Sequence, residues 1–359
     1  MNKDLHGGNI YKFQREGKDD ILDYSSNINP LGVPQKFIDI AKKSFEKLVN
    51  YPDPYYIELR KKIAEFNSLN MDNIIVGNGA TEILFLYIRA LKPKKVLILA
   101  PCFAEYERAL KSVSAKIEYF ELKESDNFYP NIINLKKEIE NNNYDLLLFC
   151  NPNNPTGQFI KLEDIKEIIE VCENKNTKIF IDEAFIEFIE NWKEKTVSLL
   201  KNKNIFIMRA FTKFFAIPGL RLGYGIGFDD EILKKMWEEK EPWTVNTFAN
   251  LAGLIILDDK EYIEKSEKWI LEEKKFMYKE LNEFQYINAY KTECNFILIK
   301  IYNISSASLR DKMIEKNILI RDASNFKFLD YHFVRLAIKD RKSNLKMLEV
   351  LADIMEYRG

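Results

Sequence analysis

The sequence predicts an α/β fold in which a large, doubly wound and mostly parallel sheet domain is joined to a smaller α+β domain. Four short segments in the middle of the chain indicate buried strands, because they are continuously apolar instead of alternating between apolar and polar residues. These segments are Lys95–Ala100, Asp145–Cys150, Lys178–Asp182 and Asn204–Arg209. Helical patterns separate them, and strands that alternate with helices are typical of a largely parallel sheet.

One of the intervening helices is clearly marked. Between the second and third of these strands, apolar residues recur at helical spacing, which predicts a helix with one buried face. The apolar positions are Leu162, Ile165, Ile168, Ile169 and Cys172. Residues 222–228, with the sequence LGYGIGF, indicate a further strand.

The pattern changes after residue 245. A long helix rich in Lys and Glu is expected over residues 258–283, followed by a strand from Asn295, a helix near residues 305–317 and a strand from Phe333. We therefore divide the chain into an N-terminal arm with part of the small domain (residues 1–45), a large domain (46–245) and a C-terminal small domain (246–359).

Composition excludes several classes of protein. The chain has 359 residues, of which 46% are hydrophobic, so a disordered or collagen-like chain is excluded. The 54 basic and 55 acidic side chains nearly cancel, which argues against nucleic-acid or membrane partners. Two histidines and four scattered cysteines leave no pattern for a metal site or a disulfide framework. With no signal-peptide core and no apolar span, a cytoplasmic protein is expected.

Two loops are candidates for ligand binding. Gly77–Glu82 precedes an apolar helix, and free amides at the start of a helix favour a phosphate group, although a plain loop-to-helix turn has the same pattern. Asn151–Gly157 directly follows a predicted strand, where open α/β sheets bind ligands. Its alternative interpretation is a simple turn rich in Asn, Pro and Gly.

Two further segments contain candidate catalytic residues. Asp182 ends a predicted strand; such an acid is often a helix cap or ion-pair partner, but it could also keep a ring nitrogen protonated. Lys213 lies among apolar residues after the next strand, where burial would lower the pKa of its amine and permit imine formation. Thr212 and Arg221 in the same segment could bind a phosphate.

Phosphate cradle, polar loop, ring-nitrogen acid and imine-forming lysine occur in the order found in fold-type-I pyridoxal-phosphate enzymes, which this sequence resembles. A nicotinamide site fits less well, because the glycine loop lacks the G-x-G-x-x-G spacing. Along almost its whole length the chain is similar to the histidinol-phosphate aminotransferase branch, and within it to enzymes that decarboxylate threonine phosphate in cobalamin biosynthesis. The matching segments are His6–Asn9, Asp23–Gly32, Tyr51–Asp53, Phe103–Tyr106, Asp182–Phe185 and Thr212–Arg221.

The resemblance implies pyridoxal 5'-phosphate as the cofactor and Lys213 as the catalytic residue that binds it covalently. Asp182 would pair with the pyridinium nitrogen, and Asn154 with the phenolic oxygen. The implied cofactor-binding residues are Ala80, Thr81, Phe103, Asn154, Asp182, Thr212, Lys213, Arg221 and Tyr51. The implied substrate-binding residues are His6, Gly7, Asn27, Asn154, Arg321 and Arg335, of which Arg335 would take the α-carboxylate. Tyr51 would reach across a dimer interface, so a homodimer is implied.

The implied reaction is decarboxylation of L-threonine O-phosphate to (R)-1-amino-2-propanol O-phosphate, and the alternative is a histidinol-phosphate aminotransferase or a related class I/II aminotransferase. Phe185 favours the first, because related aminotransferases usually carry tyrosine there. The arm at His6–Asn9 also favours it, although a frayed terminus is the simpler interpretation of the arm. Arg321 and Arg335 could likewise be ordinary surface charges, and His332 is expected to be structural.

Two alternatives come from other classes of protein. A non-catalytic pyridoxal-phosphate-binding regulator would need a DNA-binding module, and no basic helix-turn-helix segment fits ahead of residue 20. A nucleotide-binding module built on Gly77–Thr81 would leave Lys213 and Asp182 without a role.

Overall fold

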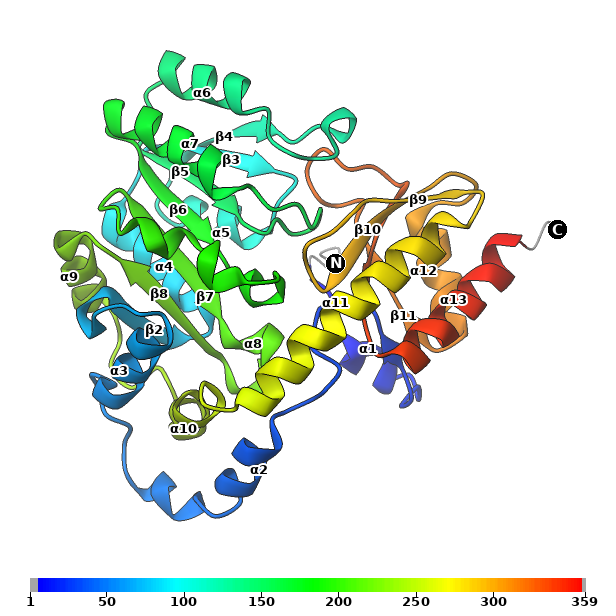
Figure 1. The fold of residues 1–359 in the computed structure, drawn as a ribbon, viewed down its shortest axis with the longest axis horizontal. Coiled ribbons are helices and arrows are strands. Elements are labelled where there is room, and N and C mark those ends of the chain that lie inside the picture. Colours follow the sequence, from blue (N-terminus) through cyan, green and yellow to red (C-terminus); the bar gives the residue numbers. More distant parts are fainter. Residues whose placement is uncertain (1–5, 357–359) are drawn as a thin grey trace.

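The computed structural model describes residues 6–356, and its centre is a seven-stranded sheet (Figure 1). The strand order is β2-β8-β7-β6-β5-β3-β4. Only β8 runs antiparallel to its neighbours, and the remaining pairs are parallel. The strands are β2 (Ile74–Asn78), β3 (Lys95–Ala100), β4 (Lys116–Glu121), β5 (Leu146–Cys150), β6 (Lys178–Asp182), β7 (Ile205–Ala210) and β8 (Leu222–Gly227). The predicted α/β class with a large, mostly parallel sheet is confirmed.

Two strands of this sheet were not predicted. β4 lies at the edge of the sheet, and none of its side chains is fully buried, so its sequence KIEYFE lacks a continuous apolar run. β2 has only three apolar residues before its Gly-Asn end. β2 and β4 are the two edge strands, and edge strands carry weaker hydrophobic signals than central strands that are covered on both faces.

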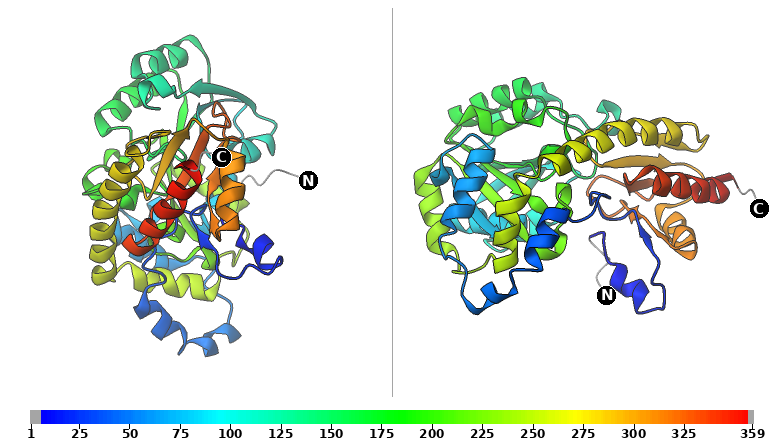
Figure 2. Two further views of the ribbon diagram at one scale, coloured as in Figure 1. Left: turned by 90° about the vertical axis from the view of Figure 1, so that its right-hand side faces the viewer. Right: turned by 60° about the horizontal axis from the view of Figure 1, so that its bottom comes forward.

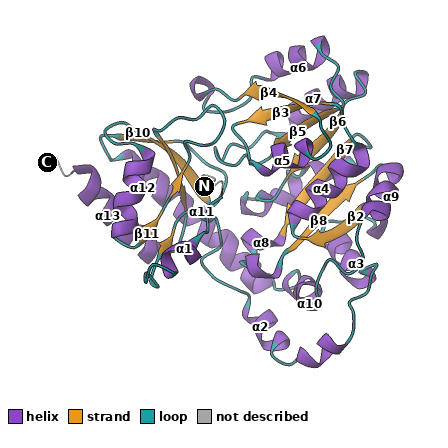
Figure 3. Ribbon diagram, turned by 180° about the vertical axis from the view of Figure 1, so that it is seen from behind, coloured by secondary structure: helices purple, strands orange, loops and turns teal. Residues whose placement is uncertain are grey.

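Helices cover both faces of the large sheet (Figure 3). Ile98 of β3 packs into one core with α4, α5 and α9, whereas Leu97 and Leu99 join the core on the other face with α3, α6 and α7. This alternation follows from the two-residue period of a strand. The helices are α3 (Ile57–Phe66), α4 (Ala80–Leu91), α5 (Glu105–Lys111), α6 (Ile132–Asn141), α7 (Leu162–Asn174) and α9 (Asp230–Glu239).

A second, antiparallel sheet lies beside the large one, with α11 running along it (Figure 2). Its strand order is β12-β13-β10-β9. The strands are β9 (Ile287–Ala289), β10 (Phe296–Ile301), β12 (Arg321–Asp322) and β13 (Phe333–Ala337). The helices in this part of the chain are α11 (Lys260–Asn282), α12 (Ser306–Glu315) and α13 (Arg341–Glu356).

The N-terminal segment connects to the smaller sheet region, because β1 (Leu22–Asp23) pairs in parallel with β11 (Ile318–Leu319). The helices in the first 73 residues, apart from α3, are α1 (Ile10–Gln14), α2 (Gln35–Ala41), η1 (Phe45–Val49) and η2 (Met71–Asn73). The short helices in the middle of the chain are η3 (Glu124–Asp126), η4 (Ile186–Phe188), η5 (Trp192–Glu194), η6 (Val197–Leu200), α8 (Phe211–Phe214) and η7 (Pro218–Leu220). The domain limits remain a prediction, and residues 1–5 and 357–359 lie outside the described part.

The expected long helix over residues 258–283 is present as α11, which begins at Lys260. The Asp259 side chain caps it by accepting from the Tyr262 amide at 3.5 Å. A separate helix, α10 (Thr247–Ile256), precedes it and was not predicted. Among the helices of residues 6–356, none combines the length and the apolar character needed to cross a membrane.

Candidate active site

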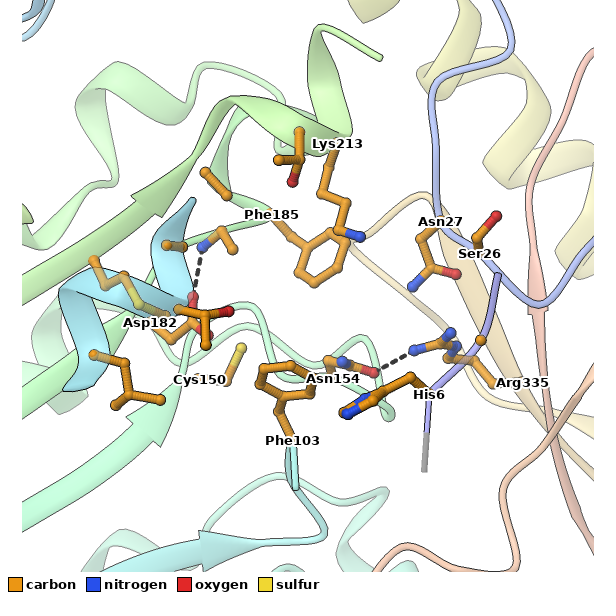
Figure 4. Close-up of a pocket in the computed structure, with 18 of the residues that line it drawn as sticks. His6, Ser26, Asn27, Phe103, Cys150, Asn154, Asp182, Phe185, Lys213 and Arg335 are labelled. Carbon is orange, nitrogen blue, oxygen red and sulfur yellow. Dashed lines mark hydrogen bonds between the residues drawn. The ribbon is translucent and has the colours of Figure 1, made fainter. Parts of the chain in front are cut away.

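A cavity of about 270 Å³ opens at the carboxyl ends of the central strands, between the two sheets (Figure 4). Residues from β5, β6, β7, α4, α8, the small sheet and the N-terminal arm line it together. Thirteen predicted site residues line this cavity: His6, Gly7, Asn27, Ala80, Thr81, Phe103, Asn154, Asp182, Thr212, Lys213, Arg221, Arg321 and Arg335. Tyr51 is the predicted site residue that does not.

Lys213 lies on α8, the single helical turn that directly follows β7, and its side chain points into the cavity (Figure 4). Burial of the amine, together with the positive charges of Arg335 and Arg221, lowers its pKa to about 8. A lysine with a lowered pKa is more often neutral, and the neutral amine is the form that attacks a carbonyl.

Asp182 ends β6 at the base of the cavity, and two groups hold its carboxylate. The Tyr106 hydroxyl donates to Oδ2 at 2.6 Å, and the Ala184 amide donates to Oδ1 at 2.9 Å. Burial raises the pKa of Asp182 to about 6. A buried carboxylate in this setting is stabilised by a cationic partner, as a protonated ring nitrogen would be. Tyr106 had no predicted role, although it belongs to the matching segment Phe103–Tyr106.

The start of α4 forms a cradle with the Arg221 side chain. Gly79 has φ +79°, and a Cβ atom there would lie 2.3 Å from Arg221 Nη2. A Cβ atom on Gly223 would lie 2.3 Å from the Ala80 amide nitrogen, so glycine is required at both positions. Together with the Thr81 hydroxyl, the free amides and the guanidinium fit an anionic phosphate.

Arg335, on β13, links the two sides of the cavity. Its Nη1 donates to Asn154 Oδ1 at 2.6 Å, and its Nη2 donates to the Ser25 carbonyl oxygen at 2.7 Å. Burial, together with the neighbouring charge of Arg321, lowers the pKa of Arg335 to about 9.

Two buried polar atoms at the cavity have no hydrogen-bond partner within the described chain, Arg335 Nε and Asn27 Oδ1. Leaving such atoms unpaired is costly, and a bound ligand would satisfy them. The cavity is therefore built for a polar ligand.

Arg321 and His6 approach the same cavity from other elements. Arg321 donates to the Asp322 carbonyl oxygen at 2.6 Å and to Asn325 Oδ1 at 2.8 Å, and its guanidinium lies 5.1 Å from the Phe326 ring centre. The His6 ring lies 5.6 Å from the Phe103 ring, centre to centre. Arg321 and Arg335 are both more than 90% buried, so neither is an ordinary surface charge.

Tyr51 lies apart from the cavity. It is 81% exposed, and its ring contacts Trp243 at 5.0 Å between centres. Within one chain its cofactor-binding role stays a prediction.

Phe185, which the sequence analysis singled out, also lines the cavity. Sequence reasoning missed the other lining residues: Ser25, Ser26, Leu84, Cys150, Ala184, Met208, Ala210 and Phe326. Ser25, Ser26 and Ala184 lie within the matching segments, which could have indicated them. Phe326 comes from a loop with no distinctive pattern.

Comparisons with known proteins agree with this geometry. The sequence model of the family "Aminotransferase class I and II" matches residues 19–351. The chain is 43% identical to a protein of Caldanaerobacter subterraneus provisionally named threonine-phosphate decarboxylase, over 98% of this chain and 94% of that protein. It is 33% identical to the threonine-phosphate decarboxylase of Salmonella typhimurium, over 98% of this chain and 96% of that protein.

Solved structures show the same fold. The histidinol-phosphate aminotransferase of Clostridium acetobutylicum superposes with a TM-score of 0.88 at 38% identity, over 94% of this chain and 99% of that one. The L-threonine-O-3-phosphate decarboxylase of Porphyromonas gingivalis superposes with a TM-score of 0.82 at 25% identity, over 93% of this chain and 99% of that one. The fold is thus fold type I, and the cofactor is pyridoxal 5'-phosphate. The chain belongs to the class I and II aminotransferase family.

Proposed function

We propose that this protein decarboxylates L-threonine O-phosphate to (R)-1-amino-2-propanol O-phosphate and serves cobalamin biosynthesis. The observation that carries the proposal is the cationic side of the cavity. Arg321, Arg335 and His6 come from β12, β13 and the N-terminal arm and face the same space as Lys213. A substrate with one carboxylate and one phosphate supplies anions for all three. The similarity to threonine-phosphate decarboxylases supports the same substrate.

In this proposal each side chain has a separate role. Arg335 binds the α-carboxylate, and its bond to Asn154 ties that contact to the cofactor's phenolic oxygen. Arg321, His6, Gly7 and Asn27 bind the phosphate group. The cofactor supplies an electron sink when it is bound, with Asp182 and Tyr106 holding the proton on its ring nitrogen. When the cofactor is bound, Ala80, Thr81, Thr212 and Arg221 would hold its phosphate group, and Phe103 would pack against its ring.

The choice of bond depends on orientation. Arg335 would set this orientation by holding the carboxylate, and so would determine which bond of the substrate breaks. Lys213, which lines the cavity and has a lowered pKa, would be the acid that returns a proton to the α-carbon in place of the CO2 that leaves.

Phe185 supports decarboxylation over transamination. Its ring lines the cavity and packs edge-on against Phe296 at 5.1 Å, and it is 5% exposed. It offers no hydroxyl group to the phenolic oxygen of the cofactor, which leaves that oxygen to Asn154.

The test is a CO2-release assay on the purified holoenzyme. We expect CO2 from O-phosphothreonine without consumption of a keto acid. Stoichiometric amino transfer to 2-oxoglutarate without CO2 would contradict the proposal. That result would favour the second candidate, a histidinol-phosphate aminotransferase, which is supported by the 38% identity to the Clostridium acetobutylicum structure and is tested with histidinol phosphate as substrate.

We also propose that the protein is a cytoplasmic homodimer in which Tyr51 reaches the partner's cavity. Exposed apolar side chains near Tyr51 in the sequence, and Trp243 against its ring, support this, since exposed apolar side chains that gather on a surface are typical of a protein interface. These side chains are Phe45, Leu48, Val49, Tyr51, Tyr55 and Trp243. Sedimentation equilibrium would give twice the chain mass of 42.4 kDa, and a monomer would contradict the proposal.

A further inference from the structure

The N-terminal arm closes one side of the cavity in close contact with Ser25. A Cβ atom on Gly7 would lie 2.0 Å from the Ser25 carbonyl oxygen, and the Gly8 amide donates to Ser25 Oγ at 2.8 Å. From there the arm reaches α5 on the large sheet. His6 Nε2 lies 2.9 Å from Oε1 of Glu105, so this ion pair joins the arm to the opposite wall of the cavity.

Glu105 has no part in the site as described so far. It does not line the cavity, yet its side chain is only 9% exposed. Glutamate is rarely buried to this extent without a partner. Its Oε2 lies 3.5 Å from Arg108 Nη1, an exposed side chain on the same helix, whereas its Oε1 is used by His6. The closer partner of the buried carboxylate is therefore His6, whose side chain is 46% exposed and lines the cavity.

The contact fixes the orientation of the His6 ring. Glu105 accepts from Nε2, and the Phe103 ring lies against the imidazole at 5.6 Å between centres. Because Nε2 faces the carboxylate, Nδ1 is left for a ligand. Figure 4 shows the His6 ring between Phe103 and Arg335, at the edge of the cavity. Carboxylates that hold one nitrogen of a histidine in this way orient the other nitrogen towards its ligand, as they do in metal sites.

We propose that Glu105 is a positioning residue that holds His6 for the phosphate group of the substrate. The phosphate group would then form a hydrogen bond with the remaining ring nitrogen, Nδ1, while Nε2 donates to Glu105. Glu105 also ties the arm to α5, so the ring is held in place before the substrate arrives. This inference deepens the proposed function and rests on it, because it takes the ligand to be a phosphorylated amine.

The test measures binding of the phosphate group apart from the carboxylate. The holoenzyme is titrated with 1-amino-2-propanol O-phosphate and with unphosphorylated 1-amino-2-propanol, and cofactor absorbance gives the two Kd values. In Glu105→Gln we expect Kd for the phosphorylated amine to rise about tenfold, the usual weight of a charge-assisted hydrogen bond, and Kd for the unphosphorylated amine to stay unchanged. In the His6→Ala background, Glu105→Gln should have no further effect.

Glu107→Gln is the matched control. Glu107 lies in the same turn of α5 but pairs with Lys111 at 2.9 Å, so its neutralisation should leave both Kd values unchanged. Equal loss of affinity for both amines in Glu105→Gln, or an undiminished effect in the His6→Ala background, would reduce Glu105 to a structural residue and overturn the inference. A wild-type enzyme that binds both amines equally would also overturn it.

The Kd measurements are independent of the assay that tests the proposed reaction. Release of CO2 from O-phosphothreonine by the wild-type enzyme decides the proposed function, whereas the Kd values decide the role of Glu105. A wild type that prefers the phosphorylated amine but releases no CO2 would reject the first and leave the second standing.

Discussion

The two sides of the cavity are built differently. The cofactor side stands on the strand ends of the large sheet, where Asp182 and Lys213 follow β6 and β7 directly. The substrate side is assembled from the N-terminal arm and the small sheet, which contribute His6, Arg321 and Arg335. Asp182 has two donors of its own, whereas Arg335 Nε has no partner among the described residues. In the proposed function, one sheet edge would thus hold the cofactor, while separate elements would meet to bind the substrate.

The largest expected effect tests the cofactor side. Lys213→Ala should abolish both activity and the visible absorbance of the bound cofactor, because the covalent link and the proton donor are lost together. Absorbance spectra of the purified variant check this. The control is Lys234→Ala, an exposed lysine on α9, which should keep the wild-type spectrum. A Lys213→Ala variant with an unchanged spectrum would mean that another lysine binds the cofactor.

The next effect tests whether the two sides are separable. Arg335→Gln should lower kcat/KM for O-phosphothreonine about a hundredfold, as expected for loss of a buried charge-assisted pair with a carboxylate. Cofactor absorbance should remain near the wild-type value, because Arg335 belongs to the substrate side. Steady-state CO2 release and a spectrum measure the two quantities. Loss of the cofactor in this variant would show that the bond from Arg335 to Asn154 makes the two sides one unit.

A smaller effect concerns the electrostatic link between the sides. Lys213 reacts as the neutral amine, and its pKa is lowered from 10.5 to about 8. The rate of cofactor uptake by the apoprotein should therefore rise about tenfold per pH unit below pH 8 and level off above it. Stopped-flow absorbance over a range of pH measures this. In Arg335→Gln the midpoint should move to higher pH, because one positive neighbour is removed. A wild-type midpoint near 10.5 would contradict the lowered pKa.

The smallest expected effect concerns Phe185, whose ring lines the cavity. Phe185→Tyr adds a hydroxyl group that can bond the phenolic oxygen of the cofactor. We expect a loss of kcat of only a few-fold, the usual weight of one neutral hydrogen bond, together with an increase in abortive amino transfer. Product analysis for CO2 and for the keto acid measures the ratio. An unchanged ratio would show that Phe185 does not influence which bond breaks.

Most of the fold could be predicted, because central strands bury both faces and are therefore continuously apolar. β4 could not, because an edge strand with half-buried side chains carries no such run. α10 could not either, because its apolar residues follow one another too closely to show a single helical stripe. Along the site, Asp182 and Lys213 were found because they end or follow predicted strands.

The sequence alone indicated the groups proposed for the cofactor side, since they lie in short segments whose local order carries the chemistry. For the substrate side the resemblance named the residues, but only the tertiary structure decided how they meet. Nothing local to Arg335 indicates that it meets Asn154, 181 residues away, and nothing local to Glu105 indicates that it holds His6, 99 residues away. These contacts depend on how the arm and the two sheets pack, and the burial that gives them their strength exists only in the folded chain.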